Sequence, residues 1–471
     1  MTLTDDVQLP YDIKNIAIIG AGPSGVATAK YLRAEHTFDN IDIFEQRTTV
    51  GGVWNYTPET SPGRSAVPQT HPDGPLERPV WTGNETQKKP CFFSPMYEQL
   101  ETNIPHPMMQ FSDLSFPEGS QLFPHHEAVM KYLERHAEEV YDLIHFATQV
   151  VDVQQEKNQR WLVRTEDLFS HEQTNHVYDA VVVASGHFNV PFIPDLENIS
   201  VWNKSYPGTI IHSKFYRTPD QFIDKKVLVI GNSASGSDIG AQVGRVCRSP
   251  LLVSQRSESE HSPGLGSYKI ELPEIKRFLV QDRAIEFIDG RLERDIDAVI
   301  VCTGYFYSYP FLSSLQPPPI TDGTRTQHVF KHIFYNHHPT LAFVAVPQKI
   351  LPFPISEAQA AVISRVWANR LHLPSEKEMD SWEGELVKEQ GGGKAFHVLK
   401  FPRDVDYVND LYHWAMQAEP SDLGRVPPFW GPKGRWIRER IPAMKRAFAD
   451  RGEERHQILR MEDLGFEYDD P

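Results

Sequence analysis

The chain has 471 residues, which is enough for about two or three domains with a sizeable buried core. Its composition, 40% hydrophobic and 23% charged, is that of a folded globular protein and excludes disorder as the main state. The formal net charge of −16 argues against a nucleic-acid partner, because an acidic protein repels the phosphate backbone.

Cysteine usage and hydropathy predict a cytoplasmic protein. Cys91, Cys247 and Cys302 are widely separated and form neither a disulfide framework nor a C-x-x-C pair, as expected in a reducing compartment. The acidic start from Met1 to Asp6 lacks the pattern of a signal peptide. No apolar run approaches the ~18 residues that span a bilayer, so we expect no stable membrane insertion.

The first elements predict a strand–helix–strand unit. Ile16 to Ile19 is a short β-branched run that leads into Gly20, and helix-compatible spacing follows from Val26 to Leu32. A second run from Ile41 to Phe44 closes a unit of about 30 residues, the length that a βαβ unit requires. The next stretch, Glu59 to Pro90, is rich in Pro, Gly, Thr and Ser and predicts a surface loop without regular structure.

A second unit of the same kind begins at Lys226 to Gly231 and returns at Leu251 to Gln255. Two further strands, Ala180 to Val183 and Ala298 to Val301, each end in a triplet of small residues. We expect the chain to pass between domains at these triplets, which are Ala184-Ser185-Gly186 and Cys302-Thr303-Gly304. Mixed strands and then helices follow His332, and Ser375 with Glu378 predicts a capping box.

A G-x-G-x-x-G sequence lies at the first strand-to-helix turn. It consists of Gly20, Ala21, Gly22, Pro23, Ser24 and Gly25. Glycines at such a turn let backbone N–H groups and the helix N-terminus approach a pyrophosphate. Glu45 follows 20 residues after Gly25, where an acid binds a ribose hydroxyl and repels a 2′-phosphate, so the site fits FAD or NAD but not NADP. The alternative is a glycine turn that only tightens packing.

The second unit repeats this pattern with opposite charge. Its turn consists of Gly231, Asn232, Ser233, Ala234, Ser235 and Gly236, with Ser233 in place of the middle glycine. Counting 20 residues from Gly236 leads to Arg256, just after Ser254 and Gln255. A guanidinium can bind a 2′-phosphate through two hydrogen bonds, which predicts NADPH. The alternative is that Arg256 is an ordinary surface charge.

Together the two sites predict an α/β fold with two Rossmann-like domains, the NADPH domain inserted into the FAD domain. We expect the first part of the FAD domain over residues 1–204, the NADPH domain over 205–310, and the second part with C-terminal helices over 311–471. NADPH would then reduce a bound flavin, and without a C-x-x-C pair the next acceptor is oxygen, a quinone or another protein.

Tyr206 to Arg217 resembles the F-x-G-x-x-x-H-x-x-x-(Y/F) signature of the flavin-containing monooxygenases, with Tyr206 in place of Phe. Other segments that agree with this family are Gly51 to Trp54, Leu100 to Asn103, Phe111 to Asp113 and Phe353 to Gln359. The resemblance runs from Asn15 to Trp414. Related Baeyer–Villiger enzymes usually carry Trp where this chain has Tyr216, which makes ketone oxidation a less suitable assignment.

The resemblance implies that Asn103 is catalytic, lying beside the flavin and the nicotinamide. Gln359 would contact the flavin ring, and His212 would have a structural role in a linker that positions NADP. The alternatives are an Asn103 that caps a turn, a Gln359 on a helix surface and a Trp54 in the core. The predicted cofactor-binding residues are Gly20, Ala21, Gly22, Pro23, Ser24, Gly25, Glu45, Gln46, Val53, Trp54, Thr102, Asn103, Val150, Gly231, Ser233, Ser235, Gly236, Ser237, Asp238, Ser254, Arg256 and Gln359.

The resemblance also implies the reaction. NADPH would reduce FAD, and the reduced flavin would take up O2 to form a C4a-hydroperoxide that oxygenates a soft N or S centre of a small molecule. Baeyer–Villiger oxidation, N-hydroxylation, a reductase or oxidase without oxygen insertion, and a dinucleotide sensor without turnover stay as alternatives, and a homo-oligomer stays open. No metal is predicted, because pairs such as His125-His126 and His337-His338 lack ligand spacing with Cys or acidic partners.

Overall fold

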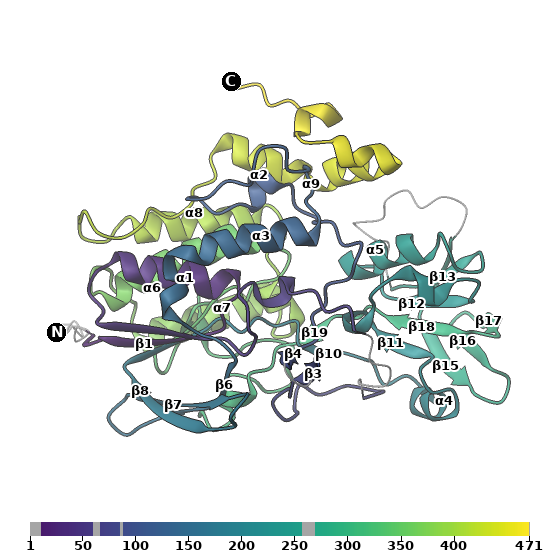
Figure 1. The fold of residues 1–471 in the computed structure, drawn as a ribbon, viewed down its shortest axis with the longest axis horizontal. Helices are drawn as coiled ribbons and strands as arrows, with labels where there is room; N and C mark the ends of the chain where they lie inside the picture. The colour runs from purple at the N-terminus through teal and green to yellow at the C-terminus, as the bar shows by residue number, and fades with distance from the viewer. Residues whose placement is uncertain (1–10, 60–65, 85–87, 257–268, 471) are drawn as a thin grey trace.

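The computed structural model describes residues 11–59, 66–84, 88–256 and 269–470, so the acidic start of the chain lies outside the described residues. Two sheets lie side by side in it, each with its own helices (Figure 1). No helix in the described ranges combines the length and the apolar character needed to cross a membrane.

The larger sheet has seven strands in the order β20-β21-β22-β9-β1-β2-β5. These strands are β1 (Asn15–Ile19), β2 (Asn40–Phe44), β5 (Ile144–His145), β9 (Ala180–Val183), β20 (Val329–Phe330), β21 (Phe334–Tyr335) and β22 (Leu341–Phe343). The central strand β1 runs parallel to both β2 and β9. Strands buried on both faces need apolar residues at every position, which explains the continuous Ile16–Ile19 run.

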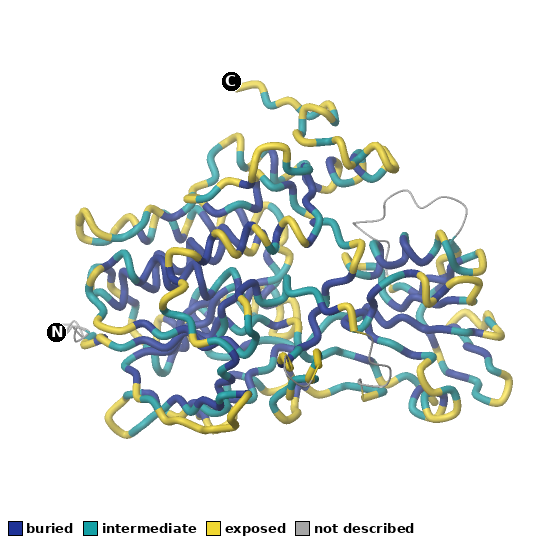
Figure 2. Tube along the Cα trace, in the orientation of Figure 1, coloured by how far each residue is buried: buried dark blue, intermediate teal, exposed yellow. Residues whose placement is uncertain are grey.

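Alternate residues of β1 face two cores. Ile16 and Ile18 pack in the core that contains α1 (Pro23–Ala34) and α6 (Pro352–Trp367), whereas Ala17 and Ile19 pack in the core on the opposite face. That second face is covered by the antiparallel strands β6 (Thr148–Gln155), β7 (Trp161–Asp167) and β8 (Gln173–Tyr178). Figure 2 shows buried residues along β1, α1 and α6 and again in the smaller sheet.

The smaller sheet has the order β11-β18-β12-β13-β14, and every pairing in it is parallel. Its strands are β11 (Ile210–His212), β12 (Val227–Ile230), β13 (Leu251–Ser254), β14 (Lys269–Leu272) and β18 (Ala298–Val301). Helix α5 (Ala234–Val243) packs on one face. The other face contacts α4 (Ile199–Ser205) and the antiparallel strands β15 (Ile275–Leu279), β16 (Ala284–Phe287) and β17 (Leu292–Arg294).

The smaller sheet is inserted in the sequence between β9 and β20 of the larger one. The chain leaves through β10 (Val190–Pro191) and returns through β19 (Tyr305–Phe306), which pair antiparallel between the two sheets (Figure 1). This topology confirms the predicted α/β fold with one Rossmann-like unit inserted into another. β13 ends at Ser254, one residue before the predicted end.

Two other predicted features have different outcomes. The Glu59–Pro90 stretch was expected to lack regular structure, but β3 (Val80–Thr82) pairs antiparallel with β4 (Lys89–Cys91), and Val, Trp and Thr of β3 are residues that favour strands. Residues 60–65 and 85–87 of this stretch lie outside the described part. The capping box is confirmed, because Ser375 and Glu378 begin α7 (Glu376–Gln390) as predicted.

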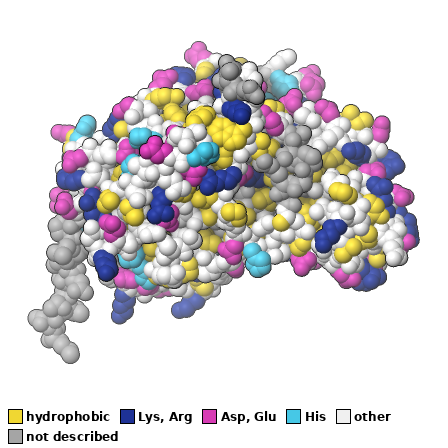
Figure 3. Space-filling view, turned by 60° about the horizontal axis from the view of Figure 1, so that its bottom comes forward, with side chains coloured by type: hydrophobic (Ala, Val, Ile, Leu, Met, Phe, Trp, Pro, Cys, Tyr) yellow, Lys and Arg dark blue, Asp and Glu magenta, His cyan; other side chains and the backbone are white. Residues whose placement is uncertain are grey.

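The remaining helices are α2 (His106–Met109), α3 (His126–Ala137), α8 (Arg403–Ala415) and α9 (Pro432–Asp450). They lie on the α1 and α6 side of the larger sheet, with α2 and α9 farther from it than α3 and α8 (Figure 1). Acidic and basic side chains are interspersed on the face that Figure 3 displays.

Candidate active site

Each parallel sheet ends in a glycine turn that brings a helix against its own strand. A Cβ added at Gly25 would lie 1.9 Å from the carbonyl oxygen of Gly20, and one at Gly236 would lie 2.0 Å from that of Gly231. Gly20 and Gly231 have φ values of +106° and +98°, which side chains rarely allow. Both turns therefore require glycine at these positions, as the sequence pattern indicated.

Ser233 is accommodated because it takes the place of Gly22 at the start of the helix. Gly22 is the N-cap of α1 and Ser233 the N-cap of α5, both with extended backbone. A Cβ at Gly22 would make only an ordinary contact of 3.5 Å with Gly52. The first N–H groups of both helices are therefore available to an anion.

A cavity of about 1650 Å³ joins the two turns. This volume exceeds the roughly 300–1,000 Å³ of a typical small-molecule pocket and suits two dinucleotides and a substrate. Fourteen of the predicted residues line it: Gly20, Gly22, Pro23, Ser24, Glu45, Gln46, Val53, Trp54, Thr102, Asn103, Val150, Ser233, Ser237 and Asp238.

The other predicted residues lie outside the cavity lining. They are Ala21, Gly25, Gly231, Ser235, Gly236, Ser254, Arg256 and Gln359. The glycines act by shaping the turns, and the hydroxyl of Ser254 donates to the carbonyl oxygen of Pro273 at 2.8 Å.

Gln359 corrects the alternative interpretation of a helix-surface amide, whereas its contact with the flavin ring stays a prediction. It is fully buried in α6, so it is not a surface amide. Its Oε1 accepts from the backbone N–H of Ala345 at 2.7 Å and its Nε2 donates to the Tyr407 hydroxyl at 2.9 Å. The amide thus holds α6 against the loop after β22 and does not face the cavity.

Glu45 lies at the end of β2 with a fixed carboxylate. It is buried, and its two oxygens accept from the backbone N–H groups of Ala21 and Arg47, both at 2.8 Å. These bonds tie the acid to the first glycine turn and orient it in the cavity wall.

Arg256 is exposed at the corresponding end of β13. Its side chain is 85% exposed and its Nε lies 2.5 Å from a carboxylate oxygen of Glu274. An exposed ion pair of this kind contributes only about 0–1 kcal/mol, so a phosphate can displace it.

Asn103 follows a segment that is fixed by its neighbours. The N–H of Thr102 donates to the carbonyl oxygen of Pro124 at 2.9 Å, and its hydroxyl donates to that of Ile104 at 2.8 Å. The Asn103 side chain is exposed in the cavity and has no hydrogen bond to any residue that the structure describes. Its amide is available to a ligand and does not cap the turn before Pro105.

Asp238 is a half-buried acid of the cavity wall. It lies on α5 and accepts hydrogen bonds from the Tyr97 hydroxyl and, at 3.2 Å, from Nε2 of Gln242. Burial raises the pKa of Asp238 above its usual range.

His212 of the signature segment is a buried structural residue. Its Nδ1 accepts from the backbone N–H of Lys214 at 3.1 Å, so Nε2 carries the proton and donates to the carbonyl oxygen of Gly304 at 3.0 Å. Burial lowers the pKa of His212 to about 3, which keeps the imidazole neutral. The residue ties β11 to the returning linker.

The pair His125 and His126 differs from the expectation for the histidine pairs. Ligand atoms of His125, His126 and Glu127 lie within 4.8 Å of one another at the start of α3. The expectation that this pair lacks an acidic partner at ligand spacing is therefore wrong, because Glu127 lies within reach of both histidines. The Nε2 of His125 already contacts the carbonyl oxygen of Glu98 at 2.6 Å.

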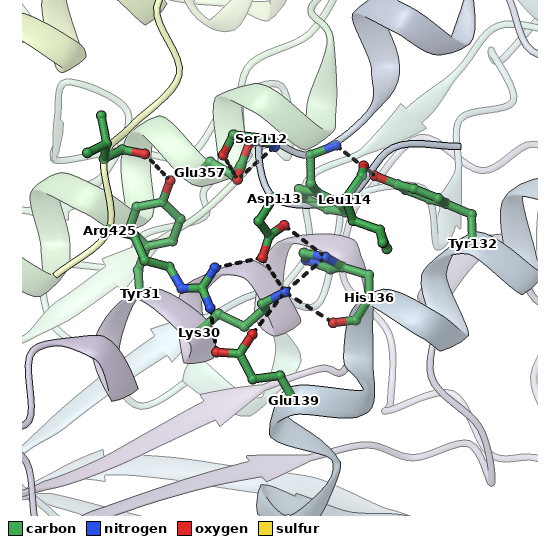
Figure 4. A network of polar contacts seen from close by, with 12 residues as sticks. Lys30, Tyr31, Ser112, Asp113, Leu114, Tyr132, His136, Glu139, Glu357 and Arg425 are labelled. Carbon is green, nitrogen blue, oxygen red and sulfur yellow. Dashed lines mark hydrogen bonds and ion pairs between the residues drawn. The ribbon is translucent and has the colours of Figure 1, made fainter. Parts of the chain in front are cut away.

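A charged network behind the cavity escaped the sequence analysis (Figure 4). Lys30 is buried and its Nζ lies 2.6 Å from Asp113 and 3.3 Å from Glu139, both of which also pair with Arg425. Glu357 lies beside the network, accepts from the N–H and hydroxyl of Ser112, and has its pKa raised to about 7 by burial. The network joins α1, the segment before α3 and the segment before α9, which no local pattern reveals.

The cavity also has a wall that the sequence analysis missed. Residues of α9 and its C-terminal end line it, among them Arg438, Lys445 and Arg446. The segment from Ala66 to Arg78 contributes as well.

Comparison with known proteins agrees with this geometry. The sequence model described as flavin-binding monooxygenase-like matches residues 80–260 and 266–420, and an NAD(P)-binding Rossmann-like model matches residues 18–73. The chain belongs to the flavin-binding monooxygenase family. The predicted resemblance is thereby confirmed. Helix α9 lies beyond the matched residues.

Relatives in this family align over nearly the whole chain. A flavin-containing monooxygenase of Arabidopsis thaliana, GS-OX-like 7, is 32% identical over 96% of this chain and 94% of its own length. A thiol-specific monooxygenase of Saccharomyces cerevisiae is 31% identical over 95% and 94%. The solved S-allyl-L-cysteine S-oxygenase of Allium sativum has 28% identity and a TM-score of 0.75, covering 97% of this chain and 98% of its own.

Proposed function

We propose that the chain is an FAD- and NADPH-dependent monooxygenase that transfers one oxygen atom from O2 to the sulfur of a small molecule. The observation that carries the proposal is the single cavity that joins both glycine turns and exposes Asn103. The relatives named for S-oxygenation and for thiols favour sulfur over nitrogen.

The residues of the first turn fit FAD. The N-terminus of α1 would face the pyrophosphate, Glu45 a ribose, and Gln46 and Val150 the adenine side of the cavity. We assign residues 1–204 and 311–471 to the FAD domain. When bound, FAD supplies hydride acceptance and oxygen activation.

The residues of the second turn fit NADPH. Ser233 and Ser237 line the cavity at the N-terminus of α5, and Arg256 carries the only charge predicted to bind the 2′-phosphate. We assign residues 205–310 to this domain.

Asn103, Trp54 and Phe353 would surround the reacting centre. The amide of Asn103, which lines the cavity, would donate a hydrogen bond to the group that reacts beside the flavin. Trp54 and Phe353 meet edge to face at 6.3 Å, and Phe353 stacks on Phe111 at 4.9 Å. Trp54 and Phe353 line the cavity and would limit the access of water to the reacting centre when the cofactors are bound. A neutral thioether reacts through its lone pair and needs no protein base.

The test is a panel of matched small substrates with NADPH and air. A thioether, a tertiary amine and a ketone of similar size are compared by product analysis. We expect the sulfoxide as the main product. Ester formation from the ketone alone would overturn the proposal, and NADPH consumption with only hydrogen peroxide would assign a reductase or oxidase.

A further inference from the structure

Helix α9 brings cationic side chains to the cavity beside Asn103. One side of α9 packs into an apolar core through Ile437, Ile441, Met444 and Phe448. This packing fixes the helix and directs Lys445 and Arg446 along the cavity wall. Arg245, just after α5, lines the same region. These cations stand out in a chain whose net charge is −16.

Lys445 is held close to the catalytic segment. Its Nζ donates to the carbonyl oxygen of Thr102 at 2.7 Å and lies 4.9 Å and 5.2 Å from the ring centroids of Phe123 and Phe448. An ammonium has three donors, and within the described part of the chain only one of them has a hydrogen-bond acceptor. No carboxylate among those residues lies within 4.0 Å of it.

The acids near Lys445 are engaged elsewhere. Glu101 lies 3.1 Å from Nε of Arg455, and Asp238 accepts from Tyr97 and Gln242. Asp450 lines the cavity on the exposed side of α9. Asp238 and Glu101 act on the partly buried Lys445 ammonium only at longer range, so an anionic ligand in direct contact with it would stabilise the charge further.

We propose that Lys445 binds a carboxylate on the sulfur substrate and so selects acidic thioethers or thiols. The inference rests on the proposed function and deepens it. Because Lys445 is bonded to the residue before Asn103, the carboxylate is held next to the amide that faces the reacting centre. The substrate therefore carries its carboxylate a few bonds from its sulfur.

The experiment uses the FAD-loaded full chain and two probes of similar size, methylthiopropanoate, which carries a carboxylate, and its uncharged primary amide. We compare the parent with Lys445→Met, with the charge-keeping Lys445→Arg, and with Lys433→Met. Lys433 lies exposed on the same helix and outside the cavity, so its variant controls for loss of a surface lysine. Sulfoxide formation gives kcat/KM, NADPH reduction of the flavin is timed separately, and the probe-induced change in the flavin spectrum gives binding.

We expect Lys445→Met to lower kcat/KM for the acid by about 10- to 100-fold and to leave the amide within about twofold, as for loss of a charged hydrogen bond. Lys445→Arg should restore most of the preference and Lys433→Met should change nothing. Equal losses for acid and amide would overturn the inference and assign Lys445 to positioning Asn103. If Lys445→Met changed only the KM for NADPH, by raising it, the inference would be overturned. Lys445 would then bind a phosphate of the cofactor and not the substrate's carboxylate.

Failure of the proposed function has a separate signature. If the parent forms no sulfoxide from either probe, the oxygenation proposal fails. The flavin spectrum still decides the inference in that case, because tighter binding of the acid than of the amide, abolished in Lys445→Met, would support it. Equal binding of both probes would contradict it.

Discussion

Asn103 presents an amide with no protein partner among the described residues to the cavity, so its removal should affect chemistry more than folding. We expect Asn103→Ala to be reduced by NADPH at nearly the parent rate. Sulfoxide formed per NADPH should fall and hydrogen peroxide should rise, because one hydrogen bond to the oxygenated site is lost. Stopped-flow reduction and product yield measure the two steps. Unchanged coupling of NADPH to product would remove Asn103 from the catalytic residues.

Arg256 should distinguish NADPH from NADH. A charged hydrogen bond contributes about 1.5–3 kcal/mol, so Arg256→Ala should weaken NADPH binding by roughly 10- to 100-fold. NADH lacks the phosphate and should reduce the flavin as before. A further variant, Glu274→Gln, releases the guanidinium from its ion pair and should tighten NADPH binding slightly. Equal losses with both nucleotides after Arg256→Ala would mean that this residue supports the fold.

Glu357 makes stability depend on pH. Burial raises its pKa from 4.5 to about 7 in the folded chain. Between these values the unfolded state releases a proton that the folded state keeps, so this residue lowers stability as pH rises through the window. The side chain introduced by Glu357→Gln cannot ionise, so the variant lacks this loss of stability. The free energy of unfolding of the variant minus that of the parent should therefore rise by about 1–3 kcal/mol between pH of about 4.5 and 8.

Denaturant unfolding at several pH values measures this difference. Glu385→Gln, at an exposed position of α7, is the matched control and should show no such trend. A constant difference between Glu357→Gln and the parent would mean that Glu357 titrates normally in the folded protein.

At the scale of single elements, helix α5 contains two glycines, Gly236 and Gly240, and we expect replacement by Ala to have opposite effects at the two positions. An added Cβ at Gly236 would lie 2.0 Å from the Gly231 carbonyl oxygen, whereas one at Gly240 would make an ordinary 3.6 Å contact with Leu251. Gly236→Ala must displace the helix from its turn, and a shift of about 1 Å at a binding site can cost roughly 100-fold in rate. We expect a large rise in the KM for NADPH with normal flavin content.

Gly240→Ala should keep its NADPH kinetics and gain up to about 1 kcal/mol of stability, because Ala is the better helix former. Steady-state kinetics and thermal unfolding of both variants test the pair. Equal kinetics in the two variants would contradict the assigned role of the second glycine turn.

The strands and turns of both βαβ units could be predicted from the sequence because their signals are local. Ala180–Val183 and Ala298–Val301 were predicted with their observed bounds, since buried parallel strands are continuous apolar runs. The pairing of β3 with β4 was missed because each strand has only three residues, too few for a recognisable alternation. Lys445 was missed because a contact across 343 residues brings it to Thr102, and no spacing in the sequence encodes such a contact.

At the scale of the whole molecule, paired linkers join the two units. β10 and β19 cross between the sheets side by side, and the cavity opens between the sheets they connect. A site shared by two dinucleotide turns allows one nucleotide to reduce a flavin held by the other. The fold alone does not choose the substrate, because one architecture can carry sites of different chemistry.

Oxygen insertion into sulfur is therefore the claim that needs the most direct test. The FAD-loaded protein is incubated with NADPH, methylthiopropanoate and ¹⁸O₂, and the sulfoxide is analysed by mass spectrometry. Our account predicts one ¹⁸O atom in each sulfoxide molecule and none when the label is supplied as H₂¹⁸O. NADPH oxidation that yields only labelled hydrogen peroxide, with the thioether recovered unchanged, would contradict it.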